Sequence, residues 1–415
     1  MWASTGPRTS GRPTSIPGPA AFGLNTDEVL LPQLLKEAGY TTAIIGKWHL
    51  GHADTKFWPR QRGFDYQYGA MIGELDYFTH SDAGVLDWFR NNEPVREEGY
   101  TTQLLGDDAV RFLDAQDASK PFYLYLTFNA PHTPYQAPEE YIAKYADIED
   151  PTRRIYAAMV DCLDENIGKV VAALERNGLR ENTLILFHSD NGGTRNAMAA
   201  GQMADVSKIK LPCDNGPYRE GKGTLFEGGH LVAAFANWPG RIQPQTVKGM
   251  IHAVDILPTI AALANASTAA CKPLDGVNVW NTIAAGEPSP RTEFVYNIEP
   301  FRAGLRQGDW KLLWRPLIPS SVDLFNLAED PYEKNNLAEQ HPEKVGAMKA
   351  RIEALGREAA RPYSLIYVVQ KGLAHGTPLM ASMDGGAPAM FDPNGPSITD
   401  EGVGDRDVVG GAHAH

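Results

Sequence analysis

Cysteine is scarce in this chain, whose 415 residues contain only Cys162, Cys213 and Cys271. An odd number of cysteines without a Cys-x-x-Cys pair excludes a fold organised by disulfides or by a zinc ribbon. The sequence also lacks a run of about 18 apolar residues, so it predicts no membrane-spanning helix. Its first residues are rich in Pro, Gly, Ser and Thr and do not have the pattern of a signal peptide, so the compartment stays open.

Positive charge is also in short supply, with 38 Lys and Arg against 51 Asp and Glu and a formal net charge of −13. This balance argues against nucleic acid as a partner and against a long polyanion held by bulk charge. A local basic cleft remains compatible with it. The apolar content of 43% and charged content of 21% are ordinary for a globular protein, and the length suffices for two domains.

Apolar periodicity predicts strands that alternate with helices. Buried strands are expected at 41–45, 121–128 and 183–187, and helices at about 26–38, 101–115 and 152–176. This alternation indicates an α/β fold with a mostly parallel central sheet flanked by helices. Residues 1–24 are expected to be irregular, and the α/β domain to occupy 25–290.

The pattern changes after about residue 290. Short strands are expected at 293–297, 304–313 and 323–327, with a turn at Gln307-Gly308-Asp309 and a helix at about 341–360. Residues 291–371 are therefore predicted to form a smaller C-terminal α+β subdomain. The remainder, 372–415, is rich in Gly, Ala, Pro and Asp and is expected to be a disordered tail.

Chemically reactive residues are concentrated in four short segments: 46–51 (Gly-Lys-Trp-His-Leu-Gly), 130–134 (Ala-Pro-His-Thr-Pro), 188–193 (His-Ser-Asp-Asn-Gly-Gly) and 221–229. The first three directly follow expected strands. Ligands of open α/β sheets bind outside the carboxyl ends of the strands. Segments that are distant in sequence can therefore meet in one site.

The side chains in these segments suit the transfer of a charged group. Lys47 and Lys222 are compact cations that can hold a tetrahedral oxyanion, and His49 and His132 can move protons near neutral pH. Each of these residues could also have no function in a site. A lone lysine is usually a solvated residue at a strand end or in a loop, and a lone histidine is usually a packed core or turn residue. In combination they favour sulfuryl or phosphoryl transfer.

Asp190 and Asn191 offer adjacent hard oxygens, which suit Ca²⁺, or less well Mg²⁺, rather than a metal that prefers thiolates. Taken alone, the pair reads equally as an Asx turn before two glycines. A second acidic pair, Asp107-Asp108, is expected on the solvated face of its helix and not as a metal site. Asp214-Asn215 is expected to form a turn, although it lies close enough to Lys222 in sequence to approach the site.

At this point the chain resembles the sulfatase family, of the arylsulfatase type, within the alkaline phosphatase superfamily. The four segments stand in the family's order, preceded by Leu-Pro-Gln-Leu-Leu-Lys-Glu-Ala-Gly-Tyr-Thr-Thr at 31–42 and followed by Asp-Leu-Phe-Asn-Leu at 323–327 and Asp-Pro at 330–331. The resemblance implies hydrolysis of a small-molecule or sugar sulfate ester.

It also implies roles for individual residues. Lys47, His132 and Lys222 would contact the sulfate, with His49 and His132 among the catalytic groups. Asp190 and Asn191 would bind Ca²⁺.

One part of the family pattern is not found. Family members carry a Cys-x-Pro-x-Arg or Ser-x-Pro-x-Arg motif, whose first residue becomes the formylglycine nucleophile, and an earlier strand that ends in two metal-binding aspartates. Neither occurs in the 415 residues, and Ser-Thr-Gly-Pro-Arg at 4–8 does not fit. We therefore expect an incomplete N-terminal half of the site and name no nucleophile. Two alternatives stay open: a phosphate or phosphonate ester hydrolase of the same superfamily, and a non-catalytic relative.

Overall fold

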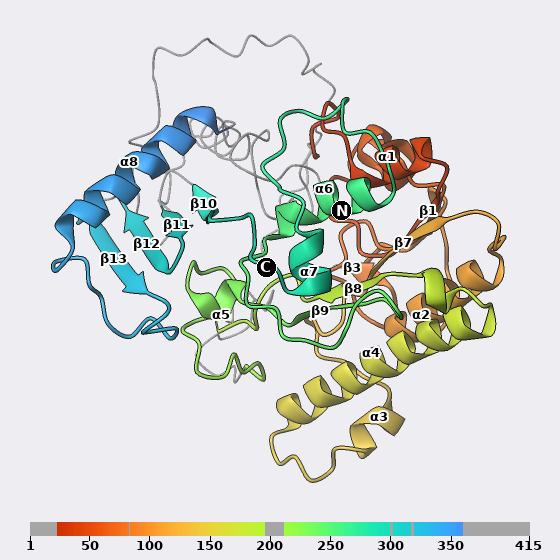
Figure 1. Cartoon of the computed structure of the whole chain (residues 1–415). Coiled ribbons are helices and arrows are strands. Elements are labelled where there is room, and N and C mark those ends of the chain that lie inside the picture. The colour runs from red at the N-terminus through yellow and green to blue at the C-terminus, as the bar shows by residue number, and fades with distance from the viewer. Residues whose placement is uncertain (1–22, 83, 196–210, 299–301, 317–318, 360–415) are drawn as a thin grey trace, which may run out of the picture.

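The computed structural model describes residues 23–82, 84–195, 211–298, 302–316 and 319–359. It shows an α/β core followed by a smaller antiparallel sheet that one long helix covers (Figure 1). The expectations for the irregular segment 1–24 and the disordered tail 372–415 fall almost entirely outside these ranges. None of the helices in the described ranges has the length and apolar character needed to cross a membrane.

The central sheet has the strand order β6-β5-β2-β1-β7. Its members are β1 (Thr41–Gly46), β2 (Tyr66–Gly69), β5 (Phe89–Arg90), β6 (Glu93–Pro94) and β7 (Phe122–Thr127). Strand β1 runs parallel to both of its neighbours, with Ile44 opposite Gln67 on one side and Tyr125 on the other. Only the short strands β5 and β6 are antiparallel. The predicted parallel sheet flanked by helices is therefore confirmed.

The strand expected at 183–187 forms but lies elsewhere. Strand β8 (Ile185–His188) pairs antiparallel with β9 (Ala234–Asn237), and within the described ranges these two strands make a sheet of their own. Strand β7 is accordingly an edge of the five-stranded sheet. A further pair, β3 (Ser81–Asp82) and β4 (Val85–Leu86), forms a small hairpin.

Helices cover both faces of the central sheet. On one face, Ala43 and Ile45 of β1 pack against α2 (Thr101–Asp114) and the end of α4 (Pro151–Arg176). On the other face, Ile44 packs with Trp48, next to α1 (Leu31–Glu37) and α6 (Ile256–Leu263). Alternate residues of β1 thus face opposite layers, as the period of two in a strand requires.

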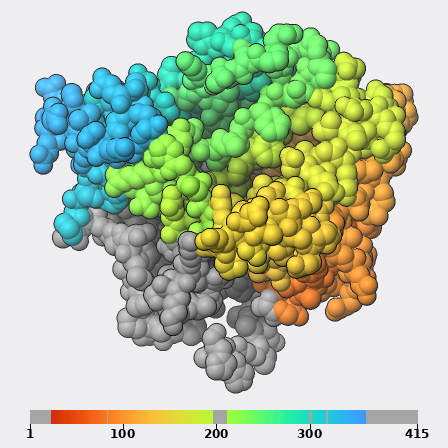
Figure 2. Space-filling view, turned by 90° about the horizontal axis from the view of Figure 1, so that it is seen from below, coloured from red at the N-terminus to blue at the C-terminus, as the bar shows by residue number. Residues whose placement is uncertain are grey.

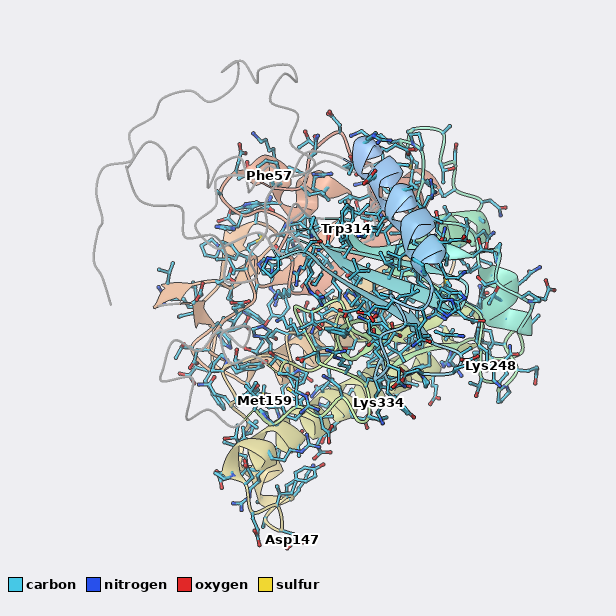
Figure 3. The ribbon with its side chains drawn as sticks, turned by 90° about the vertical axis from the view of Figure 1, so that its left-hand side faces the viewer. Phe57, Asp147, Met159, Lys248, Trp314 and Lys334 are labelled. Atoms are coloured by element: carbon cyan, nitrogen blue, oxygen red, sulfur yellow. The ribbon has the colours of Figure 1, made fainter. Side chains whose placement is uncertain are left out.

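Helix α4 begins where its sequence has strong start signals. The Asp150 side chain accepts a hydrogen bond from Arg153 N at 2.9 Å, and Pro151 occupies the first helical position. Together with α3 (Glu139–Ala143), the start of α4 projects from the body of the protein, with Asp147 at its tip (Figure 3). The remaining elements of this domain are short: α5 (Glu227–His230), α7 (Trp280–Ala285) and 3₁₀ turns at Thr55–Phe57, Pro59–Arg62, Arg180–Asn182 and Ala253–Asp255.

The expectation for the second acidic pair is wrong for one of its members. Asp107 is exposed, but Asp108 is buried and accepts hydrogen bonds from Tyr66 Oη at 2.7 Å and from Arg90 at 2.7 Å. Arg111 lies at 2.6 Å from the same carboxylate. Asp108 therefore joins α2 to β2 and β5 of the central sheet. Its burial depends on partners from β2 and β5, which helical spacing alone does not reveal.

The C-terminal subdomain matches its predicted class. Strands β10 (Glu293–Ile298), β11 (Ala303–Gln307), β12 (Trp310–Arg315) and β13 (Ser321–Asn326) form an antiparallel sheet in chain order. The strand expected at 304–313 is divided by a turn at Gly308, whose φ is +56°. Helix α8 (Pro342–Glu358) lies across this sheet, near the labelled Trp314 of β12 (Figure 3). Its apolar residues Met348, Ile352 and Leu355 contact the sheet.

A buried ion cluster joins the two domains. Lys311 of β12 is fully buried and lies 2.7 Å from Glu227 of α5 and 2.8 Å from Glu333. The Glu227 carboxylate also accepts a hydrogen bond from Tyr296 Oη at 2.6 Å. In the space-filling view the light-green segment that contains α5 lies directly against the blue C-terminal part (Figure 2).

We expect Lys311→Ala to lower the free energy of unfolding by about 3–5 kcal/mol, because it leaves two buried carboxylates without their cation. Urea denaturation followed by fluorescence measures the loss. The matched control is Arg357→Ala, which removes an exposed cation 3.9 Å from Glu353 and should cost less than about 0.5 kcal/mol. Equal losses in the two variants would contradict a structural role for the Lys311 cluster.

Candidate active site

Lys47 lies immediately beyond β1 and is fixed by its own backbone. Its N–H donates to Thr127 O at 2.8 Å, and Thr127 Oγ1 donates to Lys47 O at 2.8 Å. The parallel pairing of β1 with β7 therefore continues past the end of the strand. This pairing brings Lys47 to the carboxyl edge of the sheet, as predicted.

The loop after β2 packs directly on the Lys47 side chain. A Cβ on Gly73 would lie 2.4 Å from Lys47 Cγ, and Gly73 has φ +85°, so only glycine permits this approach. The buried carboxylate of Asp87 holds the loop by accepting hydrogen bonds from the N–H groups of Met71, Ile72 and Gly73 at 2.8–3.0 Å. This arrangement places Glu74 beside the site.

His132 lies beyond the end of β7 with its ring mostly buried. Its Nδ1 is 2.9 Å from Thr133 O, and its Nε2 is 3.1 Å from Lys222 Nζ. A carbonyl oxygen only accepts, so Nδ1 carries the ring proton, and Nε2 accepts from the lysine ammonium. His132 is thus held as a neutral imidazole whose Nε2 lone pair faces a cation.

Burial and nearby charges determine the pKa of His132. Burial, reinforced by Lys222 and Lys47, lowers the pKa of His132 below its usual value, while Glu74 opposes the change. The Glu74 carboxylate lies 3.6 Å from His132 Nε2. Burial also lowers the pKa of Lys47, against the attraction of Glu74 and Asp190. The site therefore combines two lysines and a histidine, whose charged forms burial disfavours, with nearby carboxylates that favour them.

Lys222 reaches the site from a loop rather than from a strand end. Its backbone N–H donates to Gly193 O at 3.1 Å, and the Gly192 N–H donates to Gly229 O at 3.1 Å. The segment 221–229 is therefore hydrogen-bonded along the loop that follows β8. That loop carries Asp190 and Asn191.

Asp190 and Asn191 do not form a complete metal site in the part of the chain that the structure describes. Ca²⁺ takes about 6–8 oxygen ligands, and Asp190 interacts electrostatically with Lys47. Among the described residues, no group of three or more His, Cys, Asp or Glu side chains could hold a metal ion. The residues present therefore do not fit Ca²⁺ on their own.

The structure brings together most of the residues that the sequence singled out. Lys47, His132 and Lys222 influence one another electrostatically, Asp190 acts on Lys47, and Asn191 follows Asp190 in the chain. His49 is fixed through its backbone, with φ +56° and its N–H donating to Met71 O at 2.8 Å. Its catalytic role stays a prediction.

Glu74 is the site residue that sequence reasoning missed. It follows β2, which is parallel to β1, so its position at the same edge of the sheet follows from the topology. The sequence signal for β2 was the pattern Tyr-Gln-Tyr-Gly at 66–69, which is too short to predict a strand by itself. Asp87, which orders the Glu74 loop, gave no signal in sequence.

Comparison with known proteins identifies a family. The model of the sulfatase family matches residues 5–266, a range that starts and ends earlier than the resemblance described above. The curated relatives include arylsulfatase J of Mus musculus, 32% identical over 392 residues that cover 81% of this chain and 63% of that protein. They also include N-acetylgalactosamine-6-sulfatase of Homo sapiens, 32% identical, with 66% of this chain and 52% of that protein covered. The chain thus spans about half to two thirds of the length of these relatives.

Solved structures show the same relationship. The crystal structure of Ps i-CgsB in complex with k-i-k-neocarrahexaose has a TM-score of 0.73 and 31% sequence identity to this chain. The similarity covers 85% of this chain and 79% of that one. A similarity of this extent supports the mixed α/β fold of the chain.

The charges around His132 predict two opposite changes in its pKa. Lys222→Met removes a cation that disfavours the imidazolium, so the pKa of His132 should rise towards its usual value of about 6.5. Glu74→Gln removes the carboxylate that favours the imidazolium, so the pKa should fall further. NMR titration of the imidazole measures both, with His341→Gln used to assign an unrelated signal. Shifts of the same sign in the two variants would contradict this charge arrangement.

Proposed function

The chain belongs to the sulfatase family, and on that premise we propose that it binds the sulfate group of a sugar sulfate ester for hydrolysis. The observation that carries the proposal is the convergence of Lys47, Lys222 and His132, from three distant segments, within one partly desolvated cluster. Ammonium groups in such surroundings are suited to a tetrahedral oxyanion.

The proposed roles follow from the resting contacts. Lys47 and Lys222 hold sulfate oxygens, and Lys222 gives up its contact with His132 Nε2 when it does so. The negative charge of the bound ester then favours protonation of His132, because an adjacent anion raises an imidazole pKa. The imidazolium so formed can protonate the leaving oxygen. His49, two residues after Lys47, is proposed as a further catalytic group.

A sugar is proposed as the alcohol part of the ester. Support comes from the relatives, one named for N-acetylgalactosamine-6-sulfate and one crystallised with a neocarrahexaose. The loop that carries Glu74 also exposes the ring of Phe78, which is 45% accessible. Exposed aromatic rings present a large apolar face that suits the face of a sugar.

Asp190 and Asn191 are proposed as this chain's contribution to a Ca²⁺ site. They supply about two oxygens of the roughly 6–8 that Ca²⁺ prefers, so binding to the 415-residue polypeptide should be weak. Calorimetry should detect no submicromolar Ca²⁺ site. A tight site that disappears in Asp190→Ala would show that further ligands are present.

Anion binding without turnover is the second candidate function. It is favoured by one observation: the 415 residues contain neither the Cys-x-Pro-x-Arg nor the Ser-x-Pro-x-Arg motif, so no formylglycine precursor can be named. Without a covalent nucleophile, the route through a covalent intermediate is lost. The same cation cluster would then hold the ester without cleaving it.

One set of measurements tests both candidates. Inorganic sulfate should bind to the polypeptide in calorimetry, and Lys47→Met should weaken binding by about tenfold or more, the size expected for one charge-assisted contact. Lys144→Met, which removes an exposed lysine near the projecting tip, is the matched control and should bind like the parent. Hydrolysis of an aryl sulfate distinguishes the two candidates, because turnover supports the first and binding without turnover supports the second.

Three outcomes would each reject one of the candidates or favour an alternative. Sulfate binding that is equally strong in Lys47→Met would exclude this cluster as the anion site. Stronger binding of inorganic phosphate than of sulfate would favour the phosphate ester alternative. Robust turnover that Lys47→Met abolishes would reject binding without catalysis and reveal a nucleophile that the sequence motifs do not identify.

A further inference from the structure

We infer that Asn215 is a positioning residue that fixes the Lys222 loop against the loop carrying Asp190 and Asn191. Its functional reading rests on the proposed sulfate-binding function. Asn215 makes no contact with the cluster of Lys47, His132 and Lys222 among the hydrogen bonds that the structure describes. It acts through the backbone on either side of that cluster.

The side-chain amide of Asn215 joins two loops through three hydrogen bonds. Its Oδ1 accepts from Gly193 N at 2.8 Å, and its Nδ2 donates to Gly193 O at 2.8 Å and to Glu220 O at 2.8 Å. The amide thus binds both backbone groups of Gly193, as a neighbouring strand would, and also holds the residue two positions before Lys222. Both donor hydrogens of the amide are in use.

The two loops are in close contact at this point. A Cβ on Gly221 would lie 2.0 Å from Gly193 O and 2.7 Å from Asn215 Nδ2, so no side chain fits there. Gly193 O also accepts the Lys222 N–H at 3.1 Å. One carbonyl therefore receives hydrogen bonds from both Asn215 and Lys222. The expected turn at 214–215 is present as well, since Tyr218 N donates to Asn215 O at 3.3 Å.

The backbone next to Lys222 needs such support. Glu220 has φ +57°, a left-handed conformation that is unfavourable for a residue other than glycine. The Asn215 hydrogen bond to Glu220 O holds this residue in place. Lysine has a flexible stem with four carbons, so the location of its ammonium beside His132 depends on where the loop holds its Cα. Without Asn215, the Lys222 loop loses an anchor on its N-terminal side.

The chain offers a matched control in Asn336. Its Oδ1 accepts from Leu324 N at 3.0 Å, and its Nδ2 donates to Val322 O at 2.9 Å, so it binds the backbone of β13 in the same manner. Asn336 belongs to the C-terminal subdomain and supports no loop of the candidate site. A substitution there removes a similar side chain and similar hydrogen bonds at a place where sulfate affinity should not depend on them.

The experiment compares the 415-residue protein with Asn215→Ala and Asn336→Ala. Calorimetry with inorganic sulfate measures affinity, and hydrogen exchange measures protection of the Lys222 and Gly192 amides. We expect Asn215→Ala to bind sulfate about tenfold more weakly and to exchange these two amides faster. Asn336→Ala should retain the parent's affinity and the parent's exchange at both amides, and thermal unfolding should show that both variants are folded.

Each result decides the inference. Equal sulfate affinities in Asn215→Ala and the parent would overturn it, and so would equal losses in the two variants. If the parent itself binds no sulfate, the proposed function fails. Hydrogen exchange alone then decides whether Asn215 positions the Lys222 loop. Faster exchange of the Lys222 and Gly192 amides in Asn215→Ala only would still establish the positioning role, whereas unchanged exchange would reject it. A misfolded Asn215→Ala is replaced by Asn215→Leu, which keeps the side-chain volume.

Discussion

Repulsion between like charges is the constraint on which this site depends. Lys222 Nζ lies 3.1 Å from His132 Nε2, and Lys47 is close enough to disfavour a proton on the same imidazole. If His132 were protonated in the resting state, the repulsion at this distance would be on the order of several kcal/mol at a partly screened position. The site is stable because His132 is neutral and accepts a hydrogen bond. An incoming anion would relieve the remaining repulsion, which is the physical basis of the proposed sulfate binding.

Holding these cations together requires rigid backbone, and the structure supplies it through small polar residues. Thr127 fixes the backbone at Lys47, and Asp87 orders the loop that packs on the Lys47 stem. Asn215 joins the loops on the other side of the cluster. On the C-terminal side of the Lys222 loop, Glu227 is tied to Lys311, so the smaller subdomain also stabilises this region. The carboxyl ends of parallel strands give only approximate positions, and these contacts determine the final geometry.

Much of the fold could be predicted because its signals are local. The short, continuously buried run of β1, the long amphipathic face of α4 and the turn at Gly308 depend on near neighbours in sequence. The assignment of β8 to a sheet depends on distant pairing, and the sequence did not show that its partner is β9. Short strands such as β2 contain too few residues for a clear period. Since Glu74 follows β2, it was missed along with that strand.

The same distinction applies within the site. Lys47, His132 and Lys222 stand in segments whose residue types already suggest chemistry, so they were identified before their contacts were known. Asp108 and Asn215 look like ordinary helix and turn residues in sequence. Besides Arg111, Asp108 has partners that lie 18 and 42 residues away along the chain. The partners of Asn215 in the two loops lie 5 and 22 residues away. No periodicity in the sequence encodes such pairings.

The central claim is that Lys47, Lys222 and His132 together form a site for a tetrahedral oxyanion. A crystal structure of the protein grown with selenate tests it most directly, because selenium has an anomalous signal and selenate has the shape and charge of sulfate. The account predicts selenate within hydrogen-bonding distance of Lys47 Nζ and Lys222 Nζ, with the Lys222–His132 contact lengthened. Selenate bound only elsewhere, with the Lys222–His132 contact intact, would contradict it.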